Sequence, residues 1–241
     1  VVTPTPEEVS AAKRKFQYRE DLFHFAVARV AGGGKSSLIN AFRGLLKKDM
    51  GAAATGITET TPTMARLPDP NVEYPLVWCD IPGAGTLKIP DWQYFNTQGL
   101  YIFDGIIVLF DNHFTMTDIV ILVNCRCFKI PTYIVRSKAD QHNLNIMKDD
   151  GYDSNDESEG KKKKLYQAAR QQFILKTHRS MKDNMKNANM PDQRVYIVSN
   201  TTIFGVVKGK RPKKIIDEID LLSDLIREAQ TRRGHPNAEN E

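Results

Sequence analysis

Residues 25–40 read FAVARVAGGGKSSLIN, in which an apolar run leads into three glycines, then Lys35-Ser36, and then apolar residues at helical spacing. This order is typical of the strand, loop and helix of a phosphate-binding P-loop. Glycines allow backbone N–H groups to turn toward phosphate oxygens, and the N-terminus of the following helix adds partial positive charge. Lys35 can reach the β- and γ-phosphates of a nucleotide, and the Ser36 hydroxyl can ligate Mg²⁺.

One position, Arg29, departs from this motif, because Gly-x-x-x-x-Gly-Lys-Ser has a glycine there. If the turn requires a positive φ at that point, a residue with a side chain costs roughly 1 kcal/mol or more. Gly32 and Gly33 could let the turn form slightly later in the chain. Taken alone, the stretch is also compatible with a plain strand–turn–helix corner, so the P-loop interpretation depends on the motifs that follow it.

The composition is that of an ordinary globular protein, since 41% of the 241 residues are hydrophobic and 26% are charged. No apolar run approaches the roughly 20 residues that span a bilayer, and residues 1–8 lack the basic start and apolar core of a secretory signal. The three cysteines, Cys79, Cys125 and Cys127, match no zinc-binding spacing. They predict reduced thiols in a cytoplasmic protein, with Cys79 in the core.

The formal net charge is +5, and part of it comes from two basic clusters, Lys161–Lys164 and Lys208–Lys214. Either cluster could contact phosphate or an anionic intracellular membrane as a peripheral site. The more common role of such a run is a solvated face. No aromatic interleaving or nucleic-acid-binding motif accompanies the clusters, so we expect no nucleic-acid partner.

Apolar runs and helical periodicities alternate along the chain. Strands are predicted near residues 23–30, 64–67, 74–79, 105–110, 131–135 and 194–198. Helices are predicted near residues 6–20, 35–46, 92–100, 117–125, 163–186 and 212–229, the first of them capped by Thr5. This alternation indicates an α/β fold: a P-loop NTPase three-layer sandwich with a mainly parallel sheet and helices on both faces, plus a short N-terminal helix.

The tetrapeptide Asp80-Ile81-Pro82-Gly83 follows the apolar strand predicted at 74–79. In a nucleoside triphosphatase, an aspartate at this place accepts a hydrogen bond from a Mg²⁺-bound water or ligates the metal directly. The backbone N–H of Gly83 can then be offered to the γ-phosphate. Asp and Pro-Gly are also common turn residues, so the alternative is a strand-ending turn.

Ser137-Lys138-Ala139-Asp140 matches the guanine-recognition element Asn/Thr-Lys-x-Asp, with a serine in the first place. The Asp140 carboxylate can accept two hydrogen bonds from the N1–H and 2-amino groups of guanine, and adenine offers neither, so such a site rejects the wrong base strongly. The aliphatic stem of Lys138 would lie over the ring. Ser199-Asn200, after the strand predicted at 194–198, is placed where a short loop supports the base.

These motifs, in this order and each after an apolar strand, predict a guanine-nucleotide-binding domain. The chain also resembles the immunity-related GTPases, an interferon-inducible family. The resemblance is carried by residues 34–44, 55–61, 80–86, 137–140 and 198–200 and covers about residues 20–230.

The resemblance implies binding of GTP and GDP with Mg²⁺, slow hydrolysis, homodimerisation across the nucleotide face and action at intracellular membranes. Phosphate and base would be bound by Gly32, Gly33, Gly34, Lys35, Ser36, Ser37, Lys138, Asp140, Ser199 and Asn200. Mg²⁺ would be held by Ser36, Asp80 and a first-switch threonine, Thr60 or Thr61. The catalytic set would be Lys35, Thr60, Thr61 and Gly83.

The hydrolytic step has no obvious catalytic residue, because Gly83 is followed by Ala84, Gly85 and Thr86 rather than by a water-orienting glutamine. We therefore expect turnover to be slow in the monomer and to rise when a partner face closes the site. The alternative is a GTP- and GDP-binding regulatory module with little or no hydrolysis. An ATP-dependent P-loop kinase is a third possibility, with which residues 137–140 conflict.

The expected domain division follows from composition. Residues 1–20 form an N-terminal helix or the stub of a helical domain, residues 21–230 the GTPase domain, and residues 231–241 a flexible polar tail. Residues 148–164 hold an acidic block followed by a basic block with almost no apolar residue, which predicts a disordered insertion.

Overall fold

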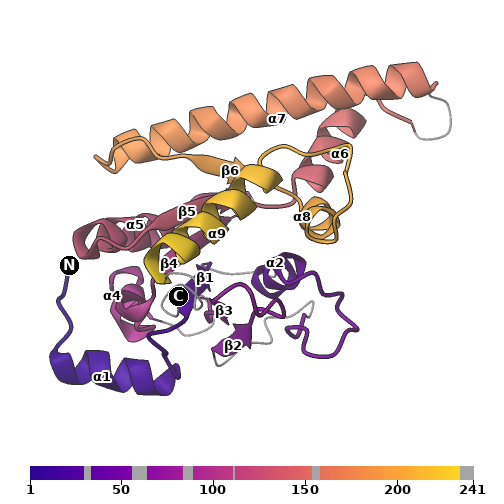
Figure 1. The fold of residues 1–241 in the computed structure, drawn as a ribbon. Helices are drawn as coiled ribbons and strands as arrows, with labels where there is room; N and C mark the ends of the chain where they lie inside the picture. Colours follow the sequence, from indigo (N-terminus) through magenta and orange to yellow (C-terminus); the bar gives the residue numbers. More distant parts are fainter. Residues whose placement is uncertain (30–33, 56–63, 84–88, 111, 154–157, 234–241) are drawn as a thin grey trace.

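A six-stranded sheet in the order β2-β3-β1-β4-β5-β6 forms the centre of the computed structural model (Figure 1). The structure describes residues 1–29, 34–55, 64–83, 89–110, 112–153 and 158–233. The strands are β1 (Phe23–Ala28), β2 (Ala65–Pro68), β3 (Leu76–Asp80), β4 (Gly105–Phe110), β5 (Thr132–Arg136) and β6 (Val195–Ile197). β2 pairs antiparallel with β3, and the other neighbouring strands pair in parallel.

Helices cover both faces of this sheet, which confirms the predicted three-layer sandwich. The helices are α1 (Pro6–Lys15), α2 (Lys35–Phe42), α4 (Asp91–Thr97), the 3₁₀ turn η1 (Leu100–Ile102), α5 (Met116–Phe128), α6 (Ala139–Asp149), α7 (Glu159–Asn187), α8 (Asn200–Val207) and α9 (Glu218–Arg233). Helices α2, α8 and α9 pack on one face, and α1, α4, α5 and the C-terminal half of α7 pack on the other. No described helix is both long enough and apolar enough to cross a membrane.

The central strands are buried along their whole length, as expected of parallel strands covered on both sides. In β1, Phe25 and Val27 point to the α2 side, whereas Ala26 and Ala28 point to the α4–α5 side. Val27 lies opposite Asp80 of β3 and Ile107 of β4. This register brings the carboxyl ends of β1, β3 and β4 to one edge of the sheet.

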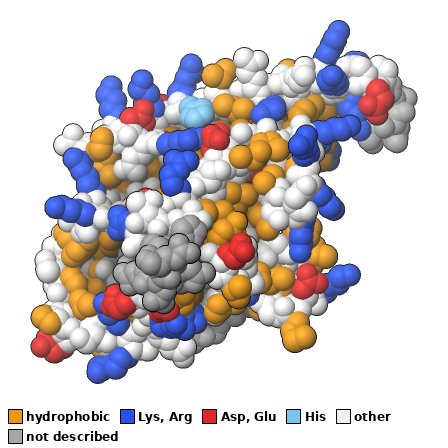
Figure 2. All heavy atoms as spheres, viewed as in Figure 1, with side chains coloured by type: hydrophobic (Ala, Val, Ile, Leu, Met, Phe, Trp, Pro, Cys, Tyr) orange, Lys and Arg blue, Asp and Glu red, His pale blue; other side chains and the backbone are white. Residues whose placement is uncertain are grey.

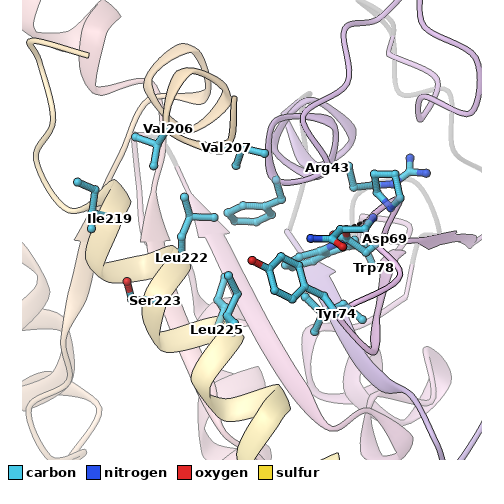
Figure 3. Close-up of a pocket in the computed structure, with 15 residues that line it drawn as sticks. Arg43, Asp69, Tyr74, Trp78, Val206, Val207, Ile219, Leu222, Ser223 and Leu225 are labelled. Carbon is cyan, nitrogen blue, oxygen red and sulfur yellow. Dashed lines mark hydrogen bonds between the residues drawn. The ribbon is translucent and has the colours of Figure 1, made fainter. Parts of the chain in front are cut away.

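An aromatic stack attaches α2 to the sheet beside a groove of about 380 Å³ between α2 and α9 (Figure 3). The Trp78 ring stacks on Phe42 of α2 with a centroid distance of 4.7 Å and on Phe25 of β1 with a centroid distance of 5.3 Å. The indole N–H of Trp78 donates to Asp69 Oδ2 at 2.9 Å. Burial raises the pKa of Asp69, and the Trp78 hydrogen bond opposes that rise. Trp78 therefore packs between Phe25 and Phe42 and also donates a hydrogen bond to the half-buried Asp69 carboxylate.

The N-terminal helix is capped as predicted, because the Thr5 hydroxyl accepts from the backbone N–H of Glu8 and the Glu8 carboxylate accepts from the N–H of Thr5. The helix is shorter than expected and ends at Lys15. Phe16 then packs on Phe103, with ring centroids 5.3 Å apart, so α1 is joined to the main domain. Whether the chain divides at residue 20 stays a prediction.

The disordered insertion predicted at residues 148–164 is wrong at both ends, because residues 148–149 end α6 and residues 159–164 form the first turns of α7. The Ser158 hydroxyl caps this helix. Farther along, buried side chains at four-residue spacing pack α7 on the domain, so tertiary packing outweighs the polar composition of the helix start. The buried side chains are those of Ala169, Phe173, Thr177, Met181 and Met185. Residues 154–157 lie outside the described part of the chain.

Two helices were missed, and one begins later than expected. α6 and α8 begin within the Ser137–Asp140 and Ser199-Asn200 motifs. The sequence pattern predicts loops at these residues, so it does not predict the helices that begin there. The helix predicted at 212–229 begins at Glu218. The other predicted strands and helices occur within a few residues of the expected bounds.

Candidate functional site

The carboxyl ends of the parallel strands meet at one edge, and backbone hydrogen bonds join the loops that leave them. Ile81 N–H donates to Val27 O at 3.2 Å, and Ser137 N–H donates to Phe110 O at 3.0 Å. Ala139 N–H donates to Val198 O at 3.1 Å. The predicted P-loop helix, the Asp80–Gly83 turn and the two motifs predicted to recognise the base are thus brought together, at the place where ligands bind open α/β sheets.

Ser36 and Asp80 form the closest side-chain contact of this edge. The Ser36 hydroxyl donates to Asp80 Oδ2 at 2.5 Å, and Asp80 is 1% exposed. Burial raises the pKa of Asp80, while the Ser36 hydrogen bond and the charge of Lys35 lower it. Within the described residues, no hydrogen-bond donor reaches the other buried oxygen, Asp80 Oδ1. The Ser36 hydroxyl and the buried Asp80 Oδ1 are oxygen ligands of the kind that a hard cation prefers.

The donor set fits Mg²⁺ bound with a phosphate better than a metal held by protein alone. Mg²⁺ usually keeps several waters and takes one or two carboxylates besides substrate phosphates. Among the residues that the structure describes, no group of three or more His, Cys, Asp and Glu side chains is arranged to hold a metal ion. Ser36 and Asp80 would therefore be the protein ligands of such an ion, directly or through water.

The start of α2 has the geometry that a phosphate site needs. Gly34 caps the helix with φ 139°, a conformation that side chains rarely adopt. Lys35 follows at the first helical position and is 7% exposed, with Ser37 in the same turn and half-buried. Gly32, Gly33, Thr60 and Thr61 lie outside the described residues, so their predicted roles stay predictions.

Arg29 lies against this helix start. A Cβ atom added to Gly34 would lie 3.0 Å from Arg29 Nη1, so the guanidinium occupies the space beside the cap. The pKa of Asp118 of α5 is raised to about 6, chiefly by burial, while hydrogen bonds from Thr115 and the charge of Arg29 limit this rise. Asp118 was not anticipated from the sequence, where it reads as an ordinary capping residue of α5. The arginine that replaces the first glycine is thus close to an acidic group as well as to the P-loop.

The Asp80–Gly83 turn is held from the opposite side by α4. The phenol of Tyr94, which is fully buried, donates to Pro82 O at 2.7 Å. Gly83 follows and is itself buried. This contact fixes the turn at the point from which the Gly83 N–H was predicted to reach a γ-phosphate.

The first predicted base-recognition motif, Ser137–Asp140, joins β5 to α6 through a strained residue. Lys138 caps α6 in the left-handed conformation, with φ 62°, which costs a non-glycine residue about 1–3 kcal/mol and is typical of functional sites. Ser137 is 2% exposed beneath it. Asp140 lies in the first turn of α6 and is exposed, so its carboxylate is accessible to a ligand.

The second predicted base-recognition motif, Ser199-Asn200, is attached to α9 by a carboxylate that the sequence did not reveal. The Ser199 side chain caps α8, because its Oγ accepts a hydrogen bond from Thr202 N–H at 3.2 Å. The backbone N–H of Ser199 donates to Glu218 Oε1 at 2.9 Å. Glu218 is 0% exposed, its other oxygen accepts from Ile216 N–H at 2.6 Å, and burial raises its pKa. Nothing in the local sequence of Glu218 distinguishes it from a surface residue of an amphipathic helix.

Side chains of α2 also hold the described chain on either side of residues 56–63. The Asn40 side chain donates to Ala53 O at 2.9 Å and accepts from Ala53 N–H at 2.7 Å. Arg43 donates to Gly51 O at 2.7 Å and to Pro68 O at 3.0 Å. The helix that presents Lys35 and Ser36 thereby also fixes the approaches to the predicted first switch.

Comparison with known proteins agrees with this arrangement. Residues 9–207 match the family model described as Interferon-inducible GTPase (IIGP). Interferon-inducible GTPase 1 of Mus musculus is 34% identical over 119 residues, which are 49% of this chain and 29% of that protein. Interferon-gamma-inducible GTPase 10 of Mus musculus is 26% identical over 178 residues, which are 73% of this chain and 39% of that protein.

The chain thus matches less than two fifths of the length of these curated relatives. In fold it is similar to the crystal structure of a dimerization-deficient mutant of Toc33 from Arabidopsis thaliana. That comparison has a TM-score of 0.50 and 13% identity, and covers 96% of this chain and 92% of the other. The family model covers most of the chain, and the P-loop helix, the Asp80 turn and both base-recognition motifs lie within it. The chain therefore belongs to the interferon-inducible GTPase family.

Proposed function

We propose that this chain binds GTP and GDP together with Mg²⁺ and hydrolyses GTP slowly. The observation that carries the proposal is the Ser36–Asp80 contact at the start of α2, with Asp80 Oδ1 buried and without a donor among the described residues. The names of the relatives, which are GTPases, support it. The proposal concerns this domain, since the relatives are much longer.

The residues have distinct tasks in this proposal. Lys35 contacts the β- and γ-phosphates, while Ser36 and Asp80 hold Mg²⁺. A Mg²⁺ ion held by Ser36 and Asp80 would supply positive charge to offset the negative charge of the phosphates. Thr60 or Thr61 closes on the GTP-bound site, and the Gly83 N–H senses the γ-phosphate. On the base, Asp140 accepts from guanine, Lys138 covers the ring, and the loop Ser199-Asn200 supports it.

Hydrolysis is expected to depend on self-association. No glutamine follows Gly83 in the positions where small GTPases orient the attacking water. In this proposal, a second copy that closes over the nucleotide face excludes water from the site. It also adds charged groups that stabilise the transition state and that the monomer does not supply. A peripheral contact with an intracellular membrane also stays a prediction. If turnover is absent at every concentration, the chain is a GTP- and GDP-binding regulatory module.

Titration with GTP, GDP and ATP, with and without Mg²⁺, tests the binding part. GTP and GDP should bind at least about a hundredfold more tightly than ATP, and Mg²⁺ should strengthen GTP binding. Lys35→Ala should abolish GTP binding at the concentrations that saturate the unchanged protein, without loss of folding by circular dichroism. Equal binding of ATP and GTP would contradict the assignment of guanine.

A hydrolysis assay at increasing protein concentration tests the second part. The rate per molecule should rise with concentration if a partner copy completes the site. A rate per molecule that is constant, with turnover present, would show that the chain hydrolyses GTP without self-association.

Replacing Arg29 by glycine should leave nucleotide binding as tight or make it tighter. The change restores the first glycine of the motif and removes the guanidinium beside Gly34. Arg29→Lys is the matched control, because it keeps the charge near Asp118 and removes the planar group. Calorimetric titration with GDP compares the three proteins. Weaker binding by Arg29→Gly, restored in Arg29→Lys, would instead give the positive charge a direct role at the phosphates.

A further inference from the structure

The two basic clusters of the sequence supply side chains to one cavity. It has a volume of about 750 Å³ and is lined by α6, the first turns of α7 and the segment that leads into α9. Its cationic lining comprises Lys162, Lys163, Arg170, Lys213 and Lys214. Figure 2 shows Lys and Arg side chains gathered over the start of α7 and α6. We propose that this basic cavity binds a small anion that carries two or more phosphate groups.

The charge of the lining favours an anion. Two carboxylates also line the cavity: Glu159, and Asp140, to which the proposed function assigns the guanine base, so the cavity adjoins that proposed base site. Five cations against two anions leave a net charge of +3. The four lining lysines are exposed, as are other members of the same clusters, such as Lys164 and Lys210, which do not line the cavity. Lys162 and Lys163 of α7 converge on the cavity with Lys213 and Lys214 of the second cluster. A purely solvated run of lysines would instead spread its charge around the helix.

The walls of the cavity are held in place before any ligand arrives. Arg170 Nη2 donates to Ile215 O at 2.6 Å, which ties α7 to the segment that carries Lys213 and Lys214. The Lys214 ammonium lies 4.7 Å from the centroid of the Tyr166 ring, a cation–π contact across the same junction. On the other side, Ile146 of α6 packs against the buried cluster that contains Phe173 of α7. Such preorganisation lowers the entropy that binding must overcome.

The size and the cation type identify the class of ligand. Cavities of roughly 300–1,000 Å³ hold small molecules, and lysine binds phosphate as a compact point charge. Four lysines around one cavity exceed what a single phosphate can engage, so the best fit is a compact scaffold with several phosphates. Tyr166, Leu144 and Met147 give the lining an apolar part against which such a scaffold can rest. A free polyphosphate and a phosphorylated lipid headgroup share this chemistry.

Calorimetric titration with inositol hexakisphosphate tests the proposal on the full chain. The double variant Lys163→Gln/Lys214→Gln should bind it about tenfold more weakly or worse. The matched control, Lys164→Gln/Lys210→Gln, makes the same change of charge in the same clusters outside the cavity and should bind within about twofold of the unchanged protein. Lys35→Ala should bind the anion normally, so a failure of the proposed GTP site can be distinguished from a failure of this one.

Vesicle sedimentation distinguishes the two sources of phosphate. Binding to phosphatidylcholine vesicles that contain a bisphosphorylated inositol lipid, lost in Lys163→Gln/Lys214→Gln only, would assign the cavity to a lipid headgroup. Binding of the soluble probe alone would assign it to a free polyphosphate. Equal losses in both double variants, no binding of either probe, or equally tight binding of polyglutamate would overturn the proposal, because each would show diffuse charge or no site at all.

Discussion

Asp140→Asn is expected to weaken GTP binding about a thousandfold, which corresponds to roughly 4 kcal/mol. The Asp140 carboxylate can accept from both the N1–H and the 2-amino group of guanine. Asparagine would turn an N–H₂ group toward one of these donors, so that two donors face each other in place of a hydrogen bond. The same variant should gain affinity for xanthosine triphosphate, because xanthine carries an acceptor oxygen where guanine has its amino group.

Calorimetric titration of both nucleotides measures this change of specificity. Asp149→Asn is the matched control, since it makes the same substitution on an exposed residue at the other end of α6. It should bind GTP like the unchanged protein. Asp140 would have no role in base recognition if its variant bound GTP with unchanged affinity and xanthosine triphosphate no better.

Trp78→Ala should lower the free energy of unfolding by about 3–5 kcal/mol, a large fraction of the roughly 5–15 kcal/mol typical of a domain. Trp78 is 2% exposed and stacks on both Phe25 and Phe42, so its removal opens a cavity between β3, β1 and α2. The substitution also deprives Asp69 of its indole donor. Because Phe42 ends the helix that begins with Lys35, nucleotide affinity should fall together with stability.

Trp78→Phe separates these contributions. It keeps an aromatic ring in the stack but removes the N–H donor and part of the ring volume, so it should lower the free energy of unfolding by about 1–3 kcal/mol, less than Trp78→Ala. Urea denaturation followed by circular dichroism measures both variants. A loss as large in Trp78→Phe as in Trp78→Ala would show that the Asp69 hydrogen bond, rather than the aromatic stack, dominates at this position.

The sheet could be predicted from the sequence because its strands are nearly continuous apolar runs. β4 occurs at the predicted residues, and β1 and β3 differ by only a few positions. The order of the motifs along these strands then placed Asp80, Asp140 and Ser199 at one edge. Local patterns sufficed there, since a parallel strand is buried on both sides and its loop carries the function.

The remaining features depend on contacts between distant parts of the chain. Glu218 reads as a surface acid until α9 packs on β6 and brings it to the Ser199 N–H. The start of α7 reads as a polar loop until Phe173 and Met181 are buried farther along the helix. The charge of Arg29 acts on Asp118 only because α5 packs on the sheet whose strand β1 leads to Arg29. Tertiary packing decides each of these cases, and a local pattern holds no signal of it.

The contact between α9 and the base-recognition loop bears on where the autonomous folding unit ends. The match to the family stops at residue 207, the last residue of α8. Beyond it, Leu221, Leu225 and Ala229 of α9 belong to the core, and the Tyr196 hydroxyl of β6 donates to Asp224 at 2.7 Å. A fragment cut at the family boundary would uncover one face of the sheet and release Ser199 from Glu218. We therefore expect the smallest independently stable unit of this domain to extend through α9.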